Sequence, residues 1–125
     1  MNRRNIVIAI AAPAALVAII TILVSSREWI ARETFARSGK SLVAKFNAAQ
    51  EKKYATDMRY TLDKFWEFYD KGLVSRNDLN DVMDTMRSLR AKNELAETDI
   101  FDFIAYVSML YTEAMHRRQS EMFPE

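Results

Sequence analysis

A few side chains have the types and spacing that chemistry would need. Glu113 and His116 are three residues apart, the helical spacing of a Glu-x-x-His pair in di-iron bundles. Such a site needs a second pair and two further carboxylates, but His116 is the only histidine in the chain. Only a symmetric dimer could complete the ligand set. A solvent-facing histidine near a helix end is the simpler interpretation.

Two short motifs resemble ligand-binding loops. Gly39-Lys40-Ser41 looks like the end of a P-loop, but the position five residues before Gly39 holds Thr34 and no strand precedes it. The stretch from Asp70 to Leu79 is similar to the tail of an EF-hand loop, yet it lacks the early Asp and Asn ligands and the bidentate Glu. A polar turn between two helices explains this stretch better.

The remaining candidates are weaker. The acidic pairs Asp99 with Asp102 and Glu94 with Glu97 have helical spacing but no histidine or second pair beside them. The chain has no cysteine, which excludes thiolate catalysis and cysteine-based zinc sites. We therefore predict a protein that is not an enzyme, with no catalytic, cofactor-binding or metal-ligating residues.

The elements that would carry any site begin with a strongly apolar segment. Residues 6–24 hold no charge over nineteen residues, and about 20 apolar residues suffice to cross a bilayer. We predict a transmembrane anchor over residues 6–26. Trp residues, and Arg residues whose side chains reach outward, are typical of the membrane–water interface. Four such residues flank the span: Arg3, Arg4, Arg27 and Trp29. Small residues that would allow close helix packing lie within the span: Ala11, Ala14, Ala15 and Ala18.

The same pattern also suits a secretory signal peptide cleaved before Arg27. The apolar run is longer than the usual signal, and no Ala-x-Ala follows it, so we favour a retained anchor. The Lys and Arg counts on the two flanks of the span are nearly equal, so they do not decide on which side of the membrane the helical domain lies. Basic residues followed by an apolar run, the order found in signal sequences, slightly favour an N-terminus on the inner side of the membrane and a helical domain on the outer side. We predict a protein that crosses the membrane once, in the inner membrane of a bacterium.

The rest of the chain is rich in charge but nearly neutral. Residues 1–37 carry five Arg and two Glu, whereas residues 38–125 carry 13 Lys or Arg and 15 Asp or Glu. A nucleic-acid-binding domain usually has a basic face. The predicted partners are therefore the lipid bilayer and other proteins of a membrane complex, or a second copy of the chain, with no nucleic acid.

The pattern after the anchor predicts an all-α fold, a small bundle of about three helices. The spanning helix should continue to about Arg37, with the first break at residues 38–40. Apolar positions then step by three and four through residues 41–70, about 75–92 and 98–118. Gly72 should end the first of these helices, Ser75 should cap the second, and Thr98 the third. Their apolar stripes should bury against one another.

The predicted organisation has five segments. They are a basic flank at 1–5, the anchor at 6–26, a juxtamembrane helix and break at 27–40, a helical domain at 41–118 and a tail at 119–125.

One aromatic group is denser than a single helix face can bury: Phe65, Trp66, Phe68 and Tyr69. Phe101 and Phe103 likewise fall on different sides of their helix. The simpler interpretation is a core with aromatic edges near a turn; the other is an exposed patch that contacts a protein partner.

Together these patterns predict a non-enzymatic, single-pass membrane protein whose helical domain mediates protein–protein contacts. An accessory or assembly subunit of a membrane complex fits this description. The alternative is a secreted or periplasmic helical binding module released by cleavage of a signal peptide.

Overall fold

The computed structural model describes residues 27–122, and within them the chain forms four helices and no strand. The all-α prediction is confirmed for this part of the chain. The predicted anchor over 6–26, with its four alanines and the flanking Arg3 and Arg4, lies outside the described residues. No helix within residues 27–122 is long and apolar enough to span a membrane.

The chain divides into two units after Thr34, and each is described by itself. In the first unit, residues 27–34 are helical. Arg27 is exposed, and so are the two large apolar side chains of this stretch, Trp29 at 65 % and Ile30 at 55 %.

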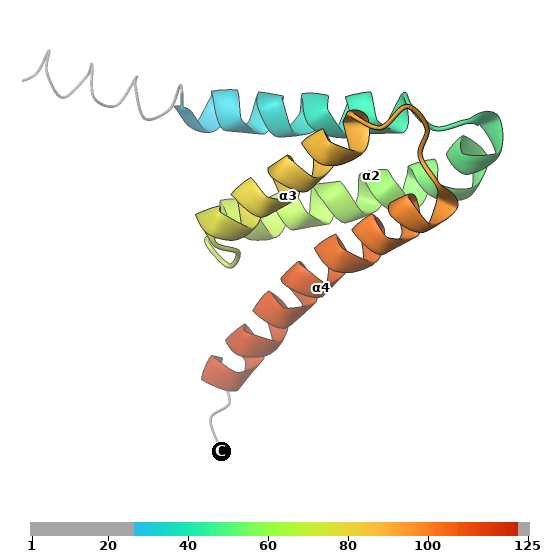
Figure 1. The fold of residues 1–125 in the computed structure, drawn as a ribbon. Helices are drawn as coiled ribbons and strands as arrows, with labels where there is room; N and C mark the ends of the chain where they lie inside the picture. The colour runs from blue at the N-terminus through green and yellow to red at the C-terminus, as the bar shows by residue number, and fades with distance from the viewer. Residues whose placement is uncertain (1–26, 123–125) are drawn as a thin grey trace, which may run out of the picture. The chain divides into compact units, whose positions relative to one another are not determined.

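The second unit is a helical bundle (Figure 1). It consists of a helix over residues 35–43, α2 (Ala48–Asp70), α3 (Arg76–Arg90) and α4 (Glu97–Met122). Helices α2 and α4 run in the same direction, because contacts join their first turns (Tyr54 to Glu97) and their later turns (Phe68 to Tyr111). The helix over 35–43 runs the opposite way along α2, because Phe35 contacts Phe65 and Gly39 contacts the earlier Leu62.

The predicted break at residues 38–40 is wrong, because the helix continues through Gly39 to residue 43. A Cβ on Gly39 would lie 2.9 Å from Leu62 Cδ1, so the missing side chain lets this helix approach α2 closely. The chain instead turns at residues 44–47. There Asn47 Oδ1 accepts a bond from Gln50 N at 2.8 Å, and Gln50 Oε1 accepts one from Asn47 N at 3.1 Å. This capping box starts α2.

The predicted turn at Gly72 is confirmed. Gly72 has φ of 75°, the left-handed conformation that glycine adopts without strain. Gly72 N donates to Tyr69 O and Leu73 N donates to Phe68 O, both at 2.9 Å. These two bonds form a Schellman motif, which satisfies the last carbonyl groups of α2.

The start of α3 is as predicted, whereas the start of α4 is not. Ser75 caps α3 by accepting a bond from Asp78 N at 3.1 Å. Helix α4 begins at Glu97, one residue before the predicted cap Thr98, and Asp99 Oδ2 accepts a bond from Ala96 N at 2.9 Å. Asp99, the third residue of the helix, thus satisfies the backbone N–H of the residue before it, as the acidic member of a capping box does. The predicted cap at Thr98 is wrong because Thr98 lies inside the first turn.

The core draws on all four elements of the second unit. Its most deeply buried large side chains are Leu42, Met58, Phe65, Val82, Met86, Ile100 and Val107. The expectation of three packed helices is therefore incomplete, because Phe35, Ser38 and Leu42 bring residues 35–43 into the same core. The apolar stripe predicted for α3 is confirmed, with Leu79, Val82, Met86 and Leu89 buried.

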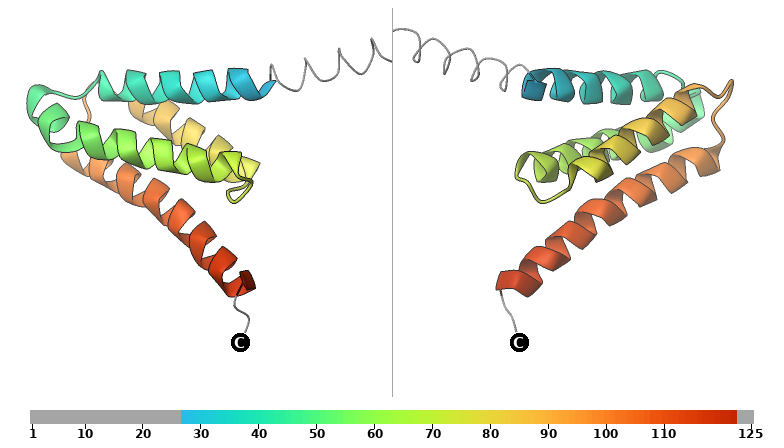
Figure 2. Two further views of the ribbon diagram at one scale, coloured as in Figure 1. Left: turned by 180° about the vertical axis from the view of Figure 1, so that it is seen from behind. Right: turned by 60° about the vertical axis from the view of Figure 1, so that its left-hand side comes forward.

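Helix α4 extends beyond the part of the bundle that covers it. Ala114 is its last buried residue, and every residue from Met115 to Met122 is exposed. Two further views show the last turns of α4 diverging from α2 and α3 (Figure 2).

Candidate functional site

The aromatic group of α2 lies at the edge of the core. Phe65 is fully buried and stacks on Phe35 with ring centroids 5.8 Å apart. Trp66 is half-buried between Phe35 at 5.3 Å and Tyr69 at 5.1 Å. A partner could therefore reach Trp66 and Tyr69, while Phe65 serves the interior.

The fourth member of this group faces α4. Phe68 is half-buried and stacks on Tyr111 with centroids 5.7 Å apart, and Lys64 Nζ lies 5.8 Å from the centroid of its ring. The four aromatic residues thus bind residues 35–43, α2 and α4 together through ring contacts, which contribute beyond their burial alone. Trp66, Phe68 and Tyr69 remain partly accessible near the turn after α2.

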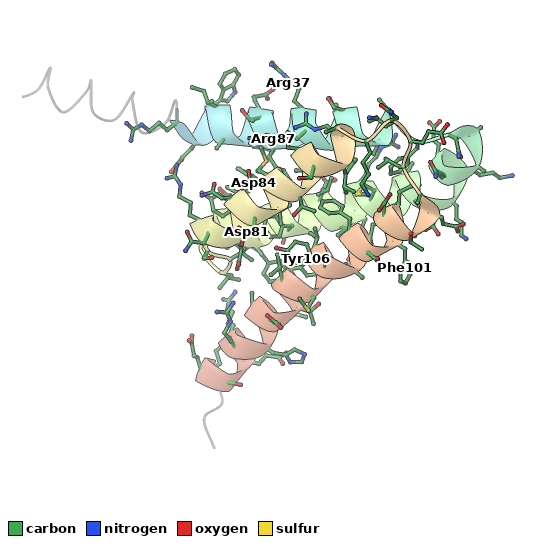
Figure 3. The ribbon with its side chains drawn as sticks, viewed as in Figure 1. Arg37, Asp81, Asp84, Arg87, Phe101 and Tyr106 are labelled. Carbon is green, nitrogen blue, oxygen red and sulfur yellow. The ribbon has the colours of Figure 1, made fainter. Side chains whose placement is uncertain are left out.

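A second apolar surface lies on α4, and of its residues only Phe101 was noted from the sequence pattern. We call it the outer face of α4: Phe101, Ala105, Met109, Met115 and Met122. The four large side chains are 61 %, 49 %, 42 % and 61 % exposed in that order. Phe101 projects from α4 away from the other helices (Figure 3). Monomeric proteins rarely group large apolar side chains in this way without an interaction to serve.

A signal for this face was present in the sequence. Once the buried stripe of Ile100, Phe103 and Val107 is assigned to the core, a further apolar series with four-residue spacing remains at Phe101, Ala105 and Met109. Helices that bury one side only do not need such a second series.

The side of α4 that faces α3 is different again. Tyr106 is half-buried there and lies on the side of Asp81 (Figure 3). Burial raises the pKa of the Tyr106 phenol, and the carboxylates of Asp81 and Asp78 raise it further. The phenol therefore stays neutral at physiological pH and cannot act as a base.

The most connected polar cluster joins the starts of α2 and α4. Glu97 accepts a bond from Tyr54 Oη at 2.6 Å and forms an ion pair with Lys53. Hydrogen bonding to Lys53 lowers the pKa of the Glu97 carboxyl, and the bond to Glu97 raises the pKa of the Tyr54 phenol. Every group in the cluster is held in its ordinary charge state, so the cluster joins two helices rather than poising a proton.

The loop between α3 and α4 is held by the same end of the bundle. Lys45 Nζ donates to the carbonyl oxygens of Arg90 and Lys92, which cap the end of α3. Gln50 Nε2 donates to Leu95 O at 2.8 Å, and Lys92 pairs with Asp99 at 2.8 Å. These bonds position backbone and leave no free nucleophile or base.

The residues weighed for chemistry are dispersed. Gly39 lies inside a helix against Leu62, so Gly39-Lys40-Ser41 forms no loop that could hold phosphate. Glu113 and His116 are both exposed on α4. Among residues 27–122, no group of three His, Asp or Glu side chains is placed to hold a metal ion.

Comparisons of this chain with protein-family models, with curated proteins and with solved structures found no match.

Proposed function

We propose that this chain is a non-enzymatic, single-pass membrane protein whose helical domain binds other proteins, as an accessory or assembly subunit of a membrane complex. The observation that carries the proposal is the outer face of α4. It places four large, exposed apolar side chains along one helix of a domain that already has a complete core. Single exposed apolar residues are ordinary, but several large ones on the uncovered side of one helix are typical of an interaction surface.

Methionine and phenylalanine suit this role. Burying each such side chain in an interface would contribute about 1.5–3 kcal/mol before the losses of association. Methionine adapts its shape to a partner, because its chain is unbranched and its sulfur is polarisable. Three of the four large exposed residues of the outer face are methionine.

The membrane part of the proposal depends on the apolar run at residues 6–24 and on the residues that follow it. Trp29 and Ile30 are exposed in the helical stretch directly after the predicted span, and Arg27 lies beside them. A Trp with neighbouring Arg and apolar side chains is the composition expected at a bilayer interface.

Photo-crosslinking in intact membranes tests the proposal. A photoreactive phenylalanine analogue replaces Phe101 in the full chain, and a matched variant carries it at Asn80, an exposed position on the polar side of α3. We expect a discrete cross-linked protein at position 101 and none at position 80. Equal labelling at both positions, or none at position 101, would contradict a binding role for this face.

The anchor has its own test. Intact-mass measurement of the mature chain should give the full 125 residues, and the chain should stay with membranes after alkaline extraction. A mass that begins near Arg27 would instead favour the released helical module.

A further inference from the structure

We propose that a hollow at one end of the bundle binds the headgroup of a zwitterionic phospholipid that carries a free ammonium group. The hollow lies between the turn after α2 and the last turns of α4, and its lining residues are Lys71, Leu73, Arg118, Glu121 and Met122. Its volume is about 650 Å³, which is within the range of small-molecule sites. The inference goes beyond the proposed protein-binding role, and it rests on the membrane part of that proposal.

The hollow is a product of the tertiary structure. The last turns of α4 diverge from α2 and α3 (Figure 2), and every residue from 115 to 122 is exposed. These turns supply three of the lining residues, and the turn after α2 supplies the other two. The hollow therefore belongs to one end of the bundle and not to the face of a single helix.

The chain enters the bundle at the same end. Phe35, the first residue of the second unit, packs on Phe65 and Trp66 with ring centroids 5.8 Å and 5.3 Å apart. Both partners lie in the last two turns of α2, next to the turn that lines the hollow. Ala48, at the other end of α2, is about 25 Å from Phe65 at 1.5 Å per residue.

The predicted span is tied closely to this end. Residues 25–34 separate the apolar run at 6–24 from Phe35, and they cover at most about 35 Å even when fully extended. Residues 27–34 are helical, which shortens the connection to about 20 Å. This is less than the length of α2, so the chain keeps the end with the hollow near the bilayer and does not require the other end to approach it.

The charges of the hollow suit a zwitterion. Lys71 and Arg118 supply two cations, but Lys71 Nζ already pairs with Glu67 Oε1 at 3.0 Å. Arg118 and Glu121 take part in no ion pair within residues 27–122. A simple anion would meet the Glu121 carboxylate, whereas a headgroup with a phosphate and an ammonium can place each opposite an unpaired charge.

Each part of such a lipid has a partner in the hollow. The Arg118 guanidinium can donate to two phosphate oxygens at once, the geometry in which Arg binds phosphate best. Glu121 is three residues further on, a neighbour on the helix surface, and its carboxylate can accept a bond from the ammonium. Leu73 and Met122 offer apolar surface to the glycerol and the first methylene groups.

The surroundings of the hollow also suit a bilayer surface. Trp66 and Tyr69 are half-buried at this end, and amphipathic aromatic rings are typical of the headgroup layer. At the other end of the bundle, every exposed residue within 44–53 and 91–98 is polar, charged or alanine. The end nearest the predicted span is thus the one whose turn and neighbouring helix ends offer aromatic and apolar side chains.

Photo-crosslinking in vesicles tests the site. The full chain is reconstituted in equal parts of phosphatidylethanolamine, phosphatidylcholine and phosphatidylglycerol, with a photoreactive phenylalanine analogue at Met122 or, as the control, at Ser120. Both positions are exposed in the last turns of α4, but Ser120 does not line the hollow. Intact-mass measurement should find a lipid adduct at position 122 and at most a trace at position 120. Phosphatidylethanolamine should be enriched about threefold over each of the other lipids in the adduct.

Charge variants then test the partners of the headgroup. Arg118→Glu should lower the adduct at position 122 about tenfold, because it replaces the phosphate partner with a repelling charge. Arg117→Glu is the matched control: it changes the net charge equally, is exposed and lies outside the lining, so it should leave the adduct nearly unchanged. Glu121→Gln should remove the preference for phosphatidylethanolamine over phosphatidylcholine. Because all three positions are exposed, helix content should stay the same, which circular dichroism checks.

The outcomes separate this inference from the proposed function. Equal lipid labelling at positions 122 and 120, or equal losses with Arg118→Glu and Arg117→Glu, would show nearness to the bilayer without a binding site and overturn the inference. A protein adduct in place of lipid at position 122 would overturn it and leave the protein-binding role standing. No lipid adduct from a chain that resists alkaline extraction would overturn the inference alone. A chain that alkaline extraction releases would overturn the membrane part of the proposed function and this inference with it.

Discussion

Helices α3 and α4 bury apolar side chains in one core, but their exposed sides differ. Every exposed residue of α3 is polar or charged, among them Asn80, Asp81, Asp84 and Arg87. The exposed residues of α4 include Phe101, Ala105, Met109, Met115 and Met122. Helix α3 thus has the composition of an element that only faces the core and water, while α4 has apolar surface left over after its core contacts are made.

The fold therefore does not depend on the apolar side chains of the outer face of α4. Two phenylalanines two residues apart on this helix illustrate it: Phe103 is 2 % exposed and Phe101 is 61 % exposed. The first contributes to stability, and the second is available for binding. Four substitutions test whether the two sides of α4 differ in this way.

Phe103→Ala should lower the free energy of unfolding by about 3–5 kcal/mol, because it leaves a cavity between α4 and the rest of the core. Denaturant unfolding of the full chain in detergent, at concentrations low enough to keep it monomeric, measures the change. A loss below about 1 kcal/mol would mean that the inner side of α4 is not closely packed.

Ser75→Ala removes the side chain that accepts a bond from Asp78 N at the start of α3. The expected loss is about 1 kcal/mol, typical of an N-cap hydroxyl. Ser88→Ala is the matched control, since Ser88 is exposed within the same helix and caps nothing. If both variants lose equal stability in the same unfolding experiment, the cap is not what stabilises α3.

Phe101→Ala should change the free energy of unfolding of the monomer by less than about 0.5 kcal/mol, as is usual for exposed positions. The same variant should abolish the cross-linked products of the outer face. A loss comparable with that of Phe103→Ala would show that Phe101 belongs to the core and would end the contrast between the two sides of α4.

The smallest effect concerns pH at the start of α4. The pKa of Glu97 is lowered by its bonds to Lys53 and Tyr54, so its ionised form stabilises the folded state. This stabilisation is present above the ordinary carboxyl pKa, near 4.5, and is lost as pH falls through the lower folded value. The stability of the parent chain should therefore exceed that of Glu97→Gln slightly at pH 6, and the gap should close in more acidic solution. A gap that is independent of pH would be evidence against a charge effect.

Much of the helical architecture follows from local patterns. The stripe of Leu79, Val82, Met86 and Leu89, the cap at Ser75 and the turn at Gly72 could all be predicted, because each depends on residues within one or two turns. The capping box of Asn47 and Gln50 is equally local, but it interrupts the single helix predicted over residues 41–70. The error at Gly39 has another origin: a glycine in a helix can mark an end or a close approach, and only the position of Leu62 distinguishes them.

The apolar run at residues 6–24, the all-α class and the apolar side of each helix follow from the sequence, since composition and periodicity are properties of the chain alone. Which apolar residues enter the core depends on how the helices pack. The last turns of α4 diverge from α2 and α3, so Met115 and Met122 stay exposed although their spacing resembles that of buried residues. Burial depends on where other helices cross α4, and that is set by packing across the whole bundle.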